Sequence, residues 1–502
     1  MKRLFDGLAL RPKQDRPRVA VLGLARSGRA VARLLSESAT ELDLELLDLH
    51  SPRDAHDPEA DQRIAREMDE LVARGAQLRI GPHDAAWLDR YDLLIKSPGI
   101  PPRVPFVAAA LARGVPVVGE IEVAALWAEG AAFAITGTNG KSTTTAWAGD
   151  MLRRAGLRAE VCGNIGRPLA EAVLENRRGP FVIELSSFQI QDSPRFTPAV
   201  AALLNFTPDH LDYHRDLAEY REAKLSLFRR LPAGALAVLG PDDTLAAEAA
   251  ADAQPGRPGP RVARFRLEDR GEPGAFVRGE GLWLRDASGE LRLLDVREVS
   301  LPGPHNLENA LAAACGAREL GAAVAAIVDS LRRFGGLPHR LELVGEVLGV
   351  RFVNDSKATN VDSLAVALRS FDRPVVLIAG GRDKGQDFVP LAPLVRQRVA
   401  TLVLIGEGAE RIGAAWSGVP ALRADDFSAA VRQAFQAATP GQTVLLSPAC
   451  ASFDLFRNYE HRGDCFREEV RRLAAESGPA ASPTAGSRMG TDTRDSSGIG
   501  KA

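Results

Sequence analysis

The sequence contains few cysteines, no large excess of either charge and no long apolar run. Its 4 cysteines among 502 residues form neither a C-x-x-C pair nor a Cys/His cluster, which argues against a zinc site or a disulfide framework. The 63 Lys and Arg residues are balanced by 65 Asp and Glu residues, so the chain has no basic field for nucleic acid or an anionic membrane.

No stretch approaches the roughly 18 uncharged residues of a membrane span, and residues 1–14 lack the apolar region of a signal peptide. We therefore expect a cytoplasmic protein, neither exported nor inserted in a membrane, whose partners are small molecules.

The fold class indicated by the residue pattern is α/β with three domains, because short apolar strand patterns followed by helical patterns recur along the chain. The predicted domains are a Rossmann-like domain over 1–119, a central P-loop ATPase-like domain with a mostly parallel sheet over 120–335, and a second Rossmann-like domain over 336–475. Residues 251–299 read as an antiparallel flap or edge, and the Gly/Ser/Pro-rich tail over 476–502 is expected to be disordered.

The strongest motif is a phosphate loop, Gly-Thr-Asn-Gly-Lys-Ser-Thr at 137–143, between a predicted strand at 131–136 and a helix predicted from Ser142 to Ala155. It is tighter than the usual P-loop, because Ile135 stands where that pattern has its first glycine. Two glycines let backbone N–H groups converge, the helix adds its positive dipole end, and Lys141 supplies a point charge for the phosphates. Ser142 can offer its hydroxyl to magnesium, so ATP with Mg²⁺ is the expected ligand.

Two acidic or histidine positions follow later strands. Glu184 ends an apolar strand, where a lone carboxylate is costly unless it is paired or bound to a metal, so it is the best candidate magnesium ligand. His210 stands between Asp209 and Asp212 after another strand; an isolated histidine is more often structural, and this one is only a candidate.

The first turn of the chain, at 23–28, departs from a dinucleotide fingerprint because Ala25 replaces its middle glycine. An NAD-dependent dehydrogenase is therefore a weak alternative from another class.

Together, the segments 137–143, 184–189 and 209–212 resemble the Mur ligases, the amino-acid-adding enzymes of peptidoglycan synthesis, in residues, order and spacing. The resemblance continues through 220–224, 305–309, 336–340, 354–360 and 447–452, and it covers nearly everything from Arg18 to about Ala475. Within the family, the segments 186–189, 354–360 and 447–452 match the branch that adds glutamate, and the Asp-Asn-Pro-Arg signature of the diaminopimelate- or lysine-adding branch is absent.

The resemblance implies an ATP-dependent ligase that joins glutamate, expected to be the D enantiomer, to UDP-N-acetylmuramoyl-L-alanine through an acyl phosphate. A related ligase that adds L-glutamate stays open, because Phe453 and Tyr459 replace the Leu and Phe often found beside Ser452. Folylpolyglutamate synthase is the runner-up; it usually carries Gly-Lys-Gly-Ser in the loop where this chain has Gly-Lys-Ser-Thr at 140–143. A non-enzymatic P-loop switch is the further alternative, but it would not need Glu184, His210 and Lys224 together.

The resemblance also assigns residues to sites. The catalytic group comprises Lys141, Glu184, His210 and Lys224. The ATP site comprises Gly137, Thr138, Asn139, Gly140, Lys141, Ser142, Thr143, Asn306, Asn309, Arg340 and Asp355. The site for the UDP-linked substrate comprises Ser27, Asp48, Ser97, Asn164, Ser186 and Gln189. The glutamate site comprises Lys357, Thr359, Lys384, Ser452, Phe453 and Tyr459.

Two magnesium sites are implied, with ligands from Ser142, Glu184, His210 and Lys224. Lys224 would act as a ligand in carbamylated form, since an ammonium repels a cation; its ordinary interpretation is a lysine on a helix surface. In the predicted roles, domain 1–119 binds the UDP substrate, 120–335 binds ATP, and 336–475 binds ATP and the incoming amino acid. We expect the protein to act as a monomer.

Overall fold

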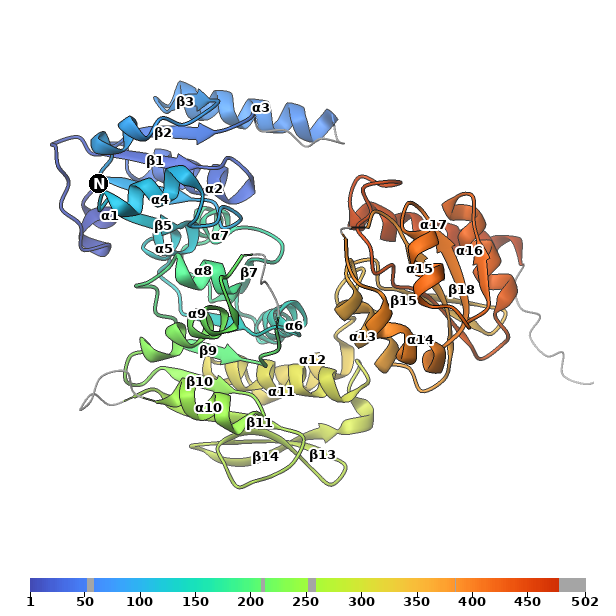
Figure 1. Cartoon of the computed structure of the whole chain (residues 1–502). Helices are drawn as coiled ribbons and strands as arrows, with labels where there is room; N and C mark the ends of the chain where they lie inside the picture. Colours follow the sequence, from blue (N-terminus) through green and yellow to red (C-terminus); the bar gives the residue numbers. More distant parts are fainter. Residues whose placement is uncertain (52–57, 209–212, 252–258, 384, 478–502) are drawn as a thin grey trace, which may run out of the picture. The chain divides into compact units, whose positions relative to one another are not determined.

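The computed structural model describes residues 1–51, 58–208, 213–251, 259–383 and 385–477 (Figure 1). By internal contacts the chain divides into an N-terminal unit, Met1–Leu337, and a C-terminal unit that begins at Pro338. The N-terminal unit contains a five-stranded and a nine-stranded sheet, and the C-terminal unit contains a six-stranded sheet. The α/β class with three mostly parallel sheets is therefore confirmed, while the domain boundaries at 119, 335 and 475 stay predictions.

The first sheet has the strand order β3-β2-β1-β4-β5, and all its pairs are parallel. Its inner strand β4 is buried along its whole length because apolar side chains pack against both faces of the sheet, which explains the continuous apolar run at 93–95. The elements are α1 (Lys2–Gly7), β1 (Arg18–Leu22), α2 (Arg26–Ser38), β2 (Asp43–Asp48), α3 (Pro58–Ala73), β3 (Gln77–Ile80), η1 (Ala85–Arg90), β4 (Leu93–Lys96), α4 (Pro105–Ala112) and β5 (Val117–Gly119).

The central sheet has the order β14-β13-β12-β11-β10-β9-β6-β8-β7. Its elements are α5 (Glu120–Ala125), β6 (Ala132–Thr136), α6 (Lys141–Arg154), β7 (Glu160–Gly163), α7 (Leu169–Glu175), β8 (Phe181–Glu184), α8 (Ser187–Gln191), β9 (Val200–Leu203), α9 (Leu217–Arg229), β10 (Leu236–Leu239), α10 (Asp243–Ala250), β11 (Arg261–Arg266), β12 (Gly274–Arg278), β13 (Gly281–Asp286), β14 (Gly289–Asp295), η2 (Val296–Glu298), α11 (Pro304–Glu319) and α12 (Val324–Arg333). Helices α6, α11 and α12 pack together on one face (Figure 1), and α7 to α10 line the core on the other face. Strand β6 lies between β8 and β9, so the carboxyl ends of these three parallel strands meet at one edge. Ligands bind at such an edge in α/β sheets.

The segment 251–299 was predicted as an antiparallel flap or edge; residues 252–258 lie outside the described part of the chain, and the prediction holds for part of 259–299. Strands β12, β13 and β14 form an antiparallel meander at the sheet edge. Strand β11, however, pairs parallel with β10, and β12 pairs parallel with β11, so both extend the central sheet.

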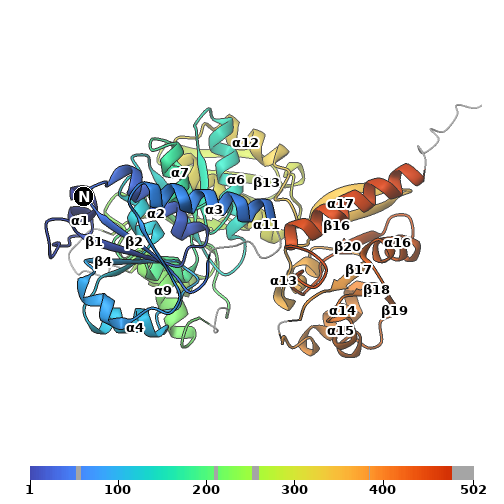
Figure 2. The same ribbon diagram turned by 90° about the horizontal axis from the view of Figure 1, so that it is seen from above.

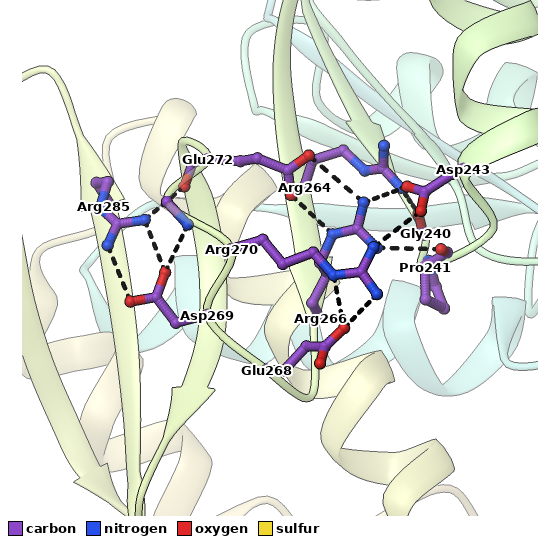
Figure 3. A network of polar contacts seen from close by, with 11 residues as sticks. Gly240, Pro241, Asp243, Arg264, Arg266, Glu268, Asp269, Arg270, Glu272 and Arg285 are labelled. Atoms are coloured by element: carbon purple, nitrogen blue, oxygen red, sulfur yellow. Dashed lines mark hydrogen bonds and ion pairs between the residues drawn. The ribbon is translucent and has the colours of Figure 1, made fainter.

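A network of arginines and carboxylates fastens this edge to α10 (Figure 3). Asp243 accepts hydrogen bonds from Arg264 at 3.0 Å and from Arg270 at 2.9 Å, and it also pairs with the buried Arg266. The pKa of Asp243 is lowered to about 2, and the hydrogen bond from Arg266 is the largest cause of this shift. Because Asp243 is exposed, each pair stabilises the fold only slightly, but together they fix how β11 meets α10.

The C-terminal unit has the strand order β15-β16-β20-β17-β18-β19, with only β15 antiparallel. Its elements are β15 (Glu342–Val347), β16 (Val350–Asn354), α13 (Val361–Arg369), β17 (Val375–Gly380), η3 (Val389–Leu391), α14 (Ala392–Arg398), β18 (Val399–Ile405), α15 (Ala409–Ala415), β19 (Ala421–Arg423), α16 (Phe427–Ala437), β20 (Thr443–Leu446) and α17 (Tyr459–Glu476). Figure 2 shows α16 and α17 on one side of these strands and α13, α14 and α15 on the other, which matches its two apolar cores. Among the residues described here, no helix is long and apolar enough to cross a membrane.

Candidate active site

The phosphate loop leaves β6 and enters α6, as predicted. Gly140 caps α6 with a left-handed backbone, at a φ of 82°. A Cβ atom at this position would lie 2.2 Å from Asn309 Oδ1, so a side chain here is excluded by both space and conformation. The first helical hydrogen bond runs from the Thr144 N–H to the Gly140 carbonyl, at 2.9 Å. The loop is therefore shaped by glycine where the chain turns into the helix.

Lys141 folds back over the loop that it follows. Its Nζ donates to the Gly137 carbonyl at 3.0 Å and to the Thr138 carbonyl at 2.8 Å. Ser142 lies in the first turn of α6 and is buried. This arrangement brings an ammonium group and a hydroxyl to the positive end of a helix, where phosphate binding is favourable.

Glu184 ends β8 beside the loop strand and is 3% exposed. Its Oε1 accepts from Asn164 Nδ2 at 2.9 Å, whereas no donor among the described residues contacts Oε2. A buried carboxylate oxygen without a partner is costly, and a hard cation that prefers oxygen ligands would satisfy it. Glu184 therefore fits a magnesium ligand, and Asn164 fixes its orientation.

Lys224 is not on a helix surface, because α9 directs it towards the loop. It is 2% exposed, its Nζ donates to the Gly137 carbonyl at 2.9 Å, and it lies 4.6 Å from the centre of the Tyr220 ring. The Tyr220 hydroxyl is 3.1 Å from Thr138 Oγ1. Helix α9 is thus tied to the phosphate loop twice. The other predicted metal ligand, His210, lies outside the described residues.

Two residues predicted for the ATP site, Asn306 and Asn309, lie on α11; the resemblance to the Mur ligases places them at the adenine. Asn309 Oδ1 accepts from Thr144 Oγ1 at 3.2 Å, which places the side chain beneath the loop, and Asn306 Nδ2 donates to the Pro302 carbonyl at 2.8 Å. These bonds show how the two side chains are held; their contact with adenine stays a prediction.

Apart from Asn164, which donates to Glu184, the residues predicted for the UDP substrate gather at two places. Ser97 Oγ donates to the Gly23 carbonyl at 2.7 Å, and Asp48 Oδ2 accepts from the Leu24 N–H at 2.6 Å, so both brace the first turn, next to Ser27. Ser186 and Gln189 form a reciprocal capping box at the start of α8, and both are buried. The structure therefore orders both groups, while their contact with a substrate stays a prediction.

In the C-terminal unit, Lys357 and Tyr459 lie together. Lys357 Nζ is 5.6 Å from the centre of the Tyr459 ring, and the Tyr459 carbonyl accepts from Ser356 Oγ at 2.8 Å. Thr359 is half-buried, Ser452 is buried and Phe453 is 47% exposed. Lys384 lies outside the described residues.

Arg462 on α17 was not predicted from the sequence. It is 2% exposed, and its guanidinium donates to Ser356 Oγ at 2.9 Å, to the Ser356 carbonyl at 2.8 Å and to the Cys450 carbonyl at 3.1 Å. Burial lowers the pKa of Arg462 to about 10. Arg462 thus joins the segments 354–360 and 447–452, which carry most of the predicted glutamate site.

Asp355, predicted to reach ATP, is a buried acid in the same unit. Burial raises its pKa to about 7, although Ser447 donates to its Oδ2 at 2.8 Å and Arg340 lies near enough to oppose the shift. The buried Nε of Arg340 has no hydrogen-bond partner among the described residues. Ionised Asp355 therefore lowers the free energy of unfolding of the C-terminal unit.

Replacing Asp355 by asparagine is expected to stabilise the C-terminal unit at pH 8. An unfolded Asp titrates near about 4, so the folded unit binds more protons between about pH 4 and 7 and loses stability as the pH rises through this window. Asp355→Asn should flatten that slope and raise the melting temperature at pH 8 by a few degrees. Thermal unfolding from pH 5 to 8 measures it. Asp426→Asn, an exchange at the cap of α16, is the control; an unchanged slope in Asp355→Asn would contradict the assignment.

Comparison with known protein families gives three matches along the chain. Residues 17–119 match the MurD-like N-terminal domain of Mur ligases, 135–317 the Mur ligase middle domain, and 339–450 the Mur ligase glutamate ligase domain.

Two curated relatives are named UDP-N-acetylmuramoylalanine–D-glutamate ligase. The protein of Pelotomaculum thermopropionicum is 41% identical over 465 residues, covering 91% of this chain and 98% of the relative. The protein of Salinibacter ruber is 43% identical over 467 residues, with the same two coverages of 91% and 98%.

Solved structures share the fold at low identity. UDP-N-acetylmuramate-alanine ligase MurC of Thermotoga maritima has a TM-score of 0.54 at 19% identity, covering 91% of this chain and 99% of its own. MurF ligase of the same organism, in complex with ADP, has a TM-score of 0.53 at 15% identity, covering 92% and 99%. With domains matched in order and identity above 40% to the two relatives over nearly their whole length, this chain belongs to the Mur ligase family.

Proposed function

We propose that this chain is an ATP-dependent ligase that adds D-glutamate to UDP-N-acetylmuramoyl-L-alanine in peptidoglycan precursor synthesis. The observation that carries the proposal is the identity of 41% and 43% to two ligases of that name over 98% of their length. The phosphate loop, Glu184 and Lys224 support it, because a family member that had lost its chemistry would not need to keep them in one place.

The reaction needs an activated carboxyl group, since a carboxylate is a poor electrophile. A carboxylate oxygen of the alanyl residue attacks the γ-phosphorus of ATP, and ADP leaves with the bridging oxygen. The glutamate amine then attacks the acyl carbon, phosphate leaves and the amine loses a proton. Both phosphoryl donor and acceptor are anions, so catalysis depends on positioning and charge neutralisation. The loop N–H groups and Lys141 supply both at the γ-phosphate.

Magnesium fits the residues present at this site. Glu184 Oε2 has no other partner among the described residues, and the Ser142 hydroxyl lies at the start of α6. These two would hold one ion; His210 and a carbamylated Lys224 would serve a second. Bound magnesium neutralises phosphate charge and helps to orient the reacting oxygens.

Glutamate would bind in the C-terminal unit, where Lys357, Thr359, Lys384 and Ser452 offer cationic and hydroxyl groups for its two carboxylates. Phe453 and Tyr459 would form the wall beside them. Arg340 and Asp355 would reach ATP from the same unit, so we infer that the unit closes on the nucleotide during each cycle.

The protein is proposed to act in the cytoplasm, where ATP and UDP-linked precursors are found, and as a monomer. Light scattering of the purified chain tests the second point, since a dimer would double the measured mass.

Phosphate release by the purified protein tests the proposal directly. We expect release only when ATP, UDP-N-acetylmuramoyl-L-alanine and D-glutamate are all present, because the amine is needed to discharge the acyl phosphate. Replacing D- by L-glutamate should lower kcat/KM at least about 100-fold, as expected where a pocket must pair both carboxylates at once. Phosphate release that ignores both cosubstrates would refute a ligase, equal use of L-glutamate would refute the stereochemistry, and turnover of a folate substrate would favour the runner-up.

A further inference from the structure

The phosphate loop donates two of its backbone N–H groups to a side chain instead of leaving them for phosphate. Thr138 N–H donates to Asn205 Oδ1 at 3.1 Å and to the Asn205 carbonyl at 3.1 Å, and Asn139 N–H donates to Asn205 Oδ1 at 2.8 Å. Asn205 lies two residues after the end of β9, and β9 is the strand that pairs with β6 on one side. One amide oxygen therefore occupies two consecutive donors of the loop.

The other end of the same amide is also used. Asn205 Nδ2 donates to the Asn139 carbonyl at 3.2 Å, so the side chain both accepts from and donates to the loop backbone. The backbones are packed closely as well, since a Cβ atom at Gly137 would lie 3.0 Å from Leu204 Cβ and 3.3 Å from Asn205 N. A phosphate that displaced Asn205 would have to break all these contacts, so the side chain is part of the loop's framework rather than a temporary occupant.

The loop thus separates into two parts. Thr138 and Asn139 are held by Asn205, whereas the N–H groups of Gly140, Ser142 and Thr143 meet no acceptor among the described residues. These groups belong to the start of α6, where N–H groups have no intrahelical acceptor and the helix dipole is positive. The donors left for an anion are those at the helix end, next to Lys141.

We propose that Asn205 is a positioning residue for ATP, whose amide fixes residues 138 and 139 so that the N–H groups beginning α6 converge on the β- and γ-phosphates. The inference rests on the proposed role of the loop in binding ATP. It assigns to Asn205 a geometry that only an amide supplies: an oxygen facing two N–H groups and an N–H facing a carbonyl.

Two substitutions separate these requirements. Asn205→Ala removes all the side-chain contacts and should weaken ADP binding and raise the KM for ATP about 10-fold, the effect of losing two or three neutral hydrogen bonds. Asn205→Asp keeps the acceptor but sets a carboxylate against the Asn139 carbonyl and adds a negative charge beside the phosphates. We therefore expect ADP binding to weaken and the KM for ATP to rise about 100-fold. The KM for UDP-N-acetylmuramoyl-L-alanine should stay within about twofold of wild type in both.

Asn176 offers a matched control. Its Oδ1 accepts from the N–H groups of Arg178 and Gly179 at 3.2 and 3.0 Å, and its Nδ2 donates to the Arg158 carbonyl at 3.1 Å and also to Glu160 Oε1 at 2.9 Å. The three bonds to backbone atoms repeat those of Asn205, in a turn that precedes β8 and is no part of the phosphate loop. Asn176→Ala should cost similar stability and leave ADP binding unchanged.

Calorimetric titration of the full chain with ADP and magnesium, together with the KM values, tests the inference. Weaker ADP binding in both Asn205 variants but not in Asn176→Ala supports it; Asn205→Ser replaces the Asp variant if that one does not fold. Unchanged binding in the Asn205 variants, or equal weakening in Asn176→Ala, overturns the role of Asn205 while the proposed function stands. A wild-type chain that does not bind ADP overturns the proposed function, and the role of Asn205 with it.

Discussion

Replacing Glu184 by glutamine is expected to lower kcat at least about 1,000-fold. The change removes one negative charge from a buried carboxylate whose Oε2 has no other partner among the described residues. The carboxylate would hold the magnesium ion that neutralises the phosphates, and losing such charge stabilisation at a transferring phosphoryl group has effects of this size. Glutamine keeps Oε1 as the acceptor for Asn164 Nδ2, so the strand end should not move. Steady-state phosphate release at saturating substrates measures the loss.

Glu160→Gln is the control that shows whether the loss of kcat depends on the position of Glu184 or follows from losing any carboxylate charge nearby. Glu160 lies at the other end of the same pair of strands, since β7 pairs Glu160 with Phe181 and Gly163 with Glu184. It is paired with Arg167, so the exchange costs some stability but should leave kcat within about twofold. Raised magnesium should recover part of the activity of Glu184→Gln and leave that of Glu160→Gln unchanged. A Glu184→Gln enzyme with near wild-type kcat would remove Glu184 from the metal site.

The phosphate loop could be predicted from the sequence because its determinants are local. A strand was predicted at 131–136 and β6 spans 132–136, and the helix predicted from Ser142 to Ala155 is α6, Lys141–Arg154. Gly140 and Lys141 are adjacent in sequence, and the left-handed glycine before the helix is a signal that the local sequence carries. Strand, glycine turn and helix start therefore leave a continuous pattern.

Asn205 and Arg462 could not be predicted in the same way. Asn205 contacts a loop that precedes it by 66 residues, and Arg462 contacts Ser356 across 106 residues. An asparagine after a strand and an arginine in a helix with many charged residues have the ordinary interpretations of a turn and a solvent-exposed side chain. The packing of β9 beside β6 brings Asn205 to backbone N–H groups of the phosphate loop. The packing of α17 against the loop after β16 likewise brings Arg462 to a backbone carbonyl group of that loop.

The same limit applies to Lys224, whose local sequence reads as a helix surface and whose side chain is buried against the loop. Replacing Lys224 by alanine is expected to lower kcat about 1,000-fold, for one of two reasons. If Lys224 is carbamylated, the variant loses anionic oxygens that bind magnesium. If it is an ammonium, the variant loses the donor to the Gly137 carbonyl and the cation beside the Tyr220 ring.

Chemical rescue distinguishes the two reasons. Removing the long side chain leaves a space beside Gly137 that a small molecule can enter. A carbamate is replaced by a short-chain carboxylate, whereas an ammonium is replaced by a short alkylamine, so rescue by acetate or propionate is the result expected from the proposed ligand role. Arg221→Ala, on the same helix and paired with Glu248, should respond to neither. Rescue by methylamine alone would show that Lys224 works as a cation under the loop, and full activity of Lys224→Ala without any additive would remove it from the site, because a group that binds a catalytic metal or holds the phosphate loop cannot be lost without effect.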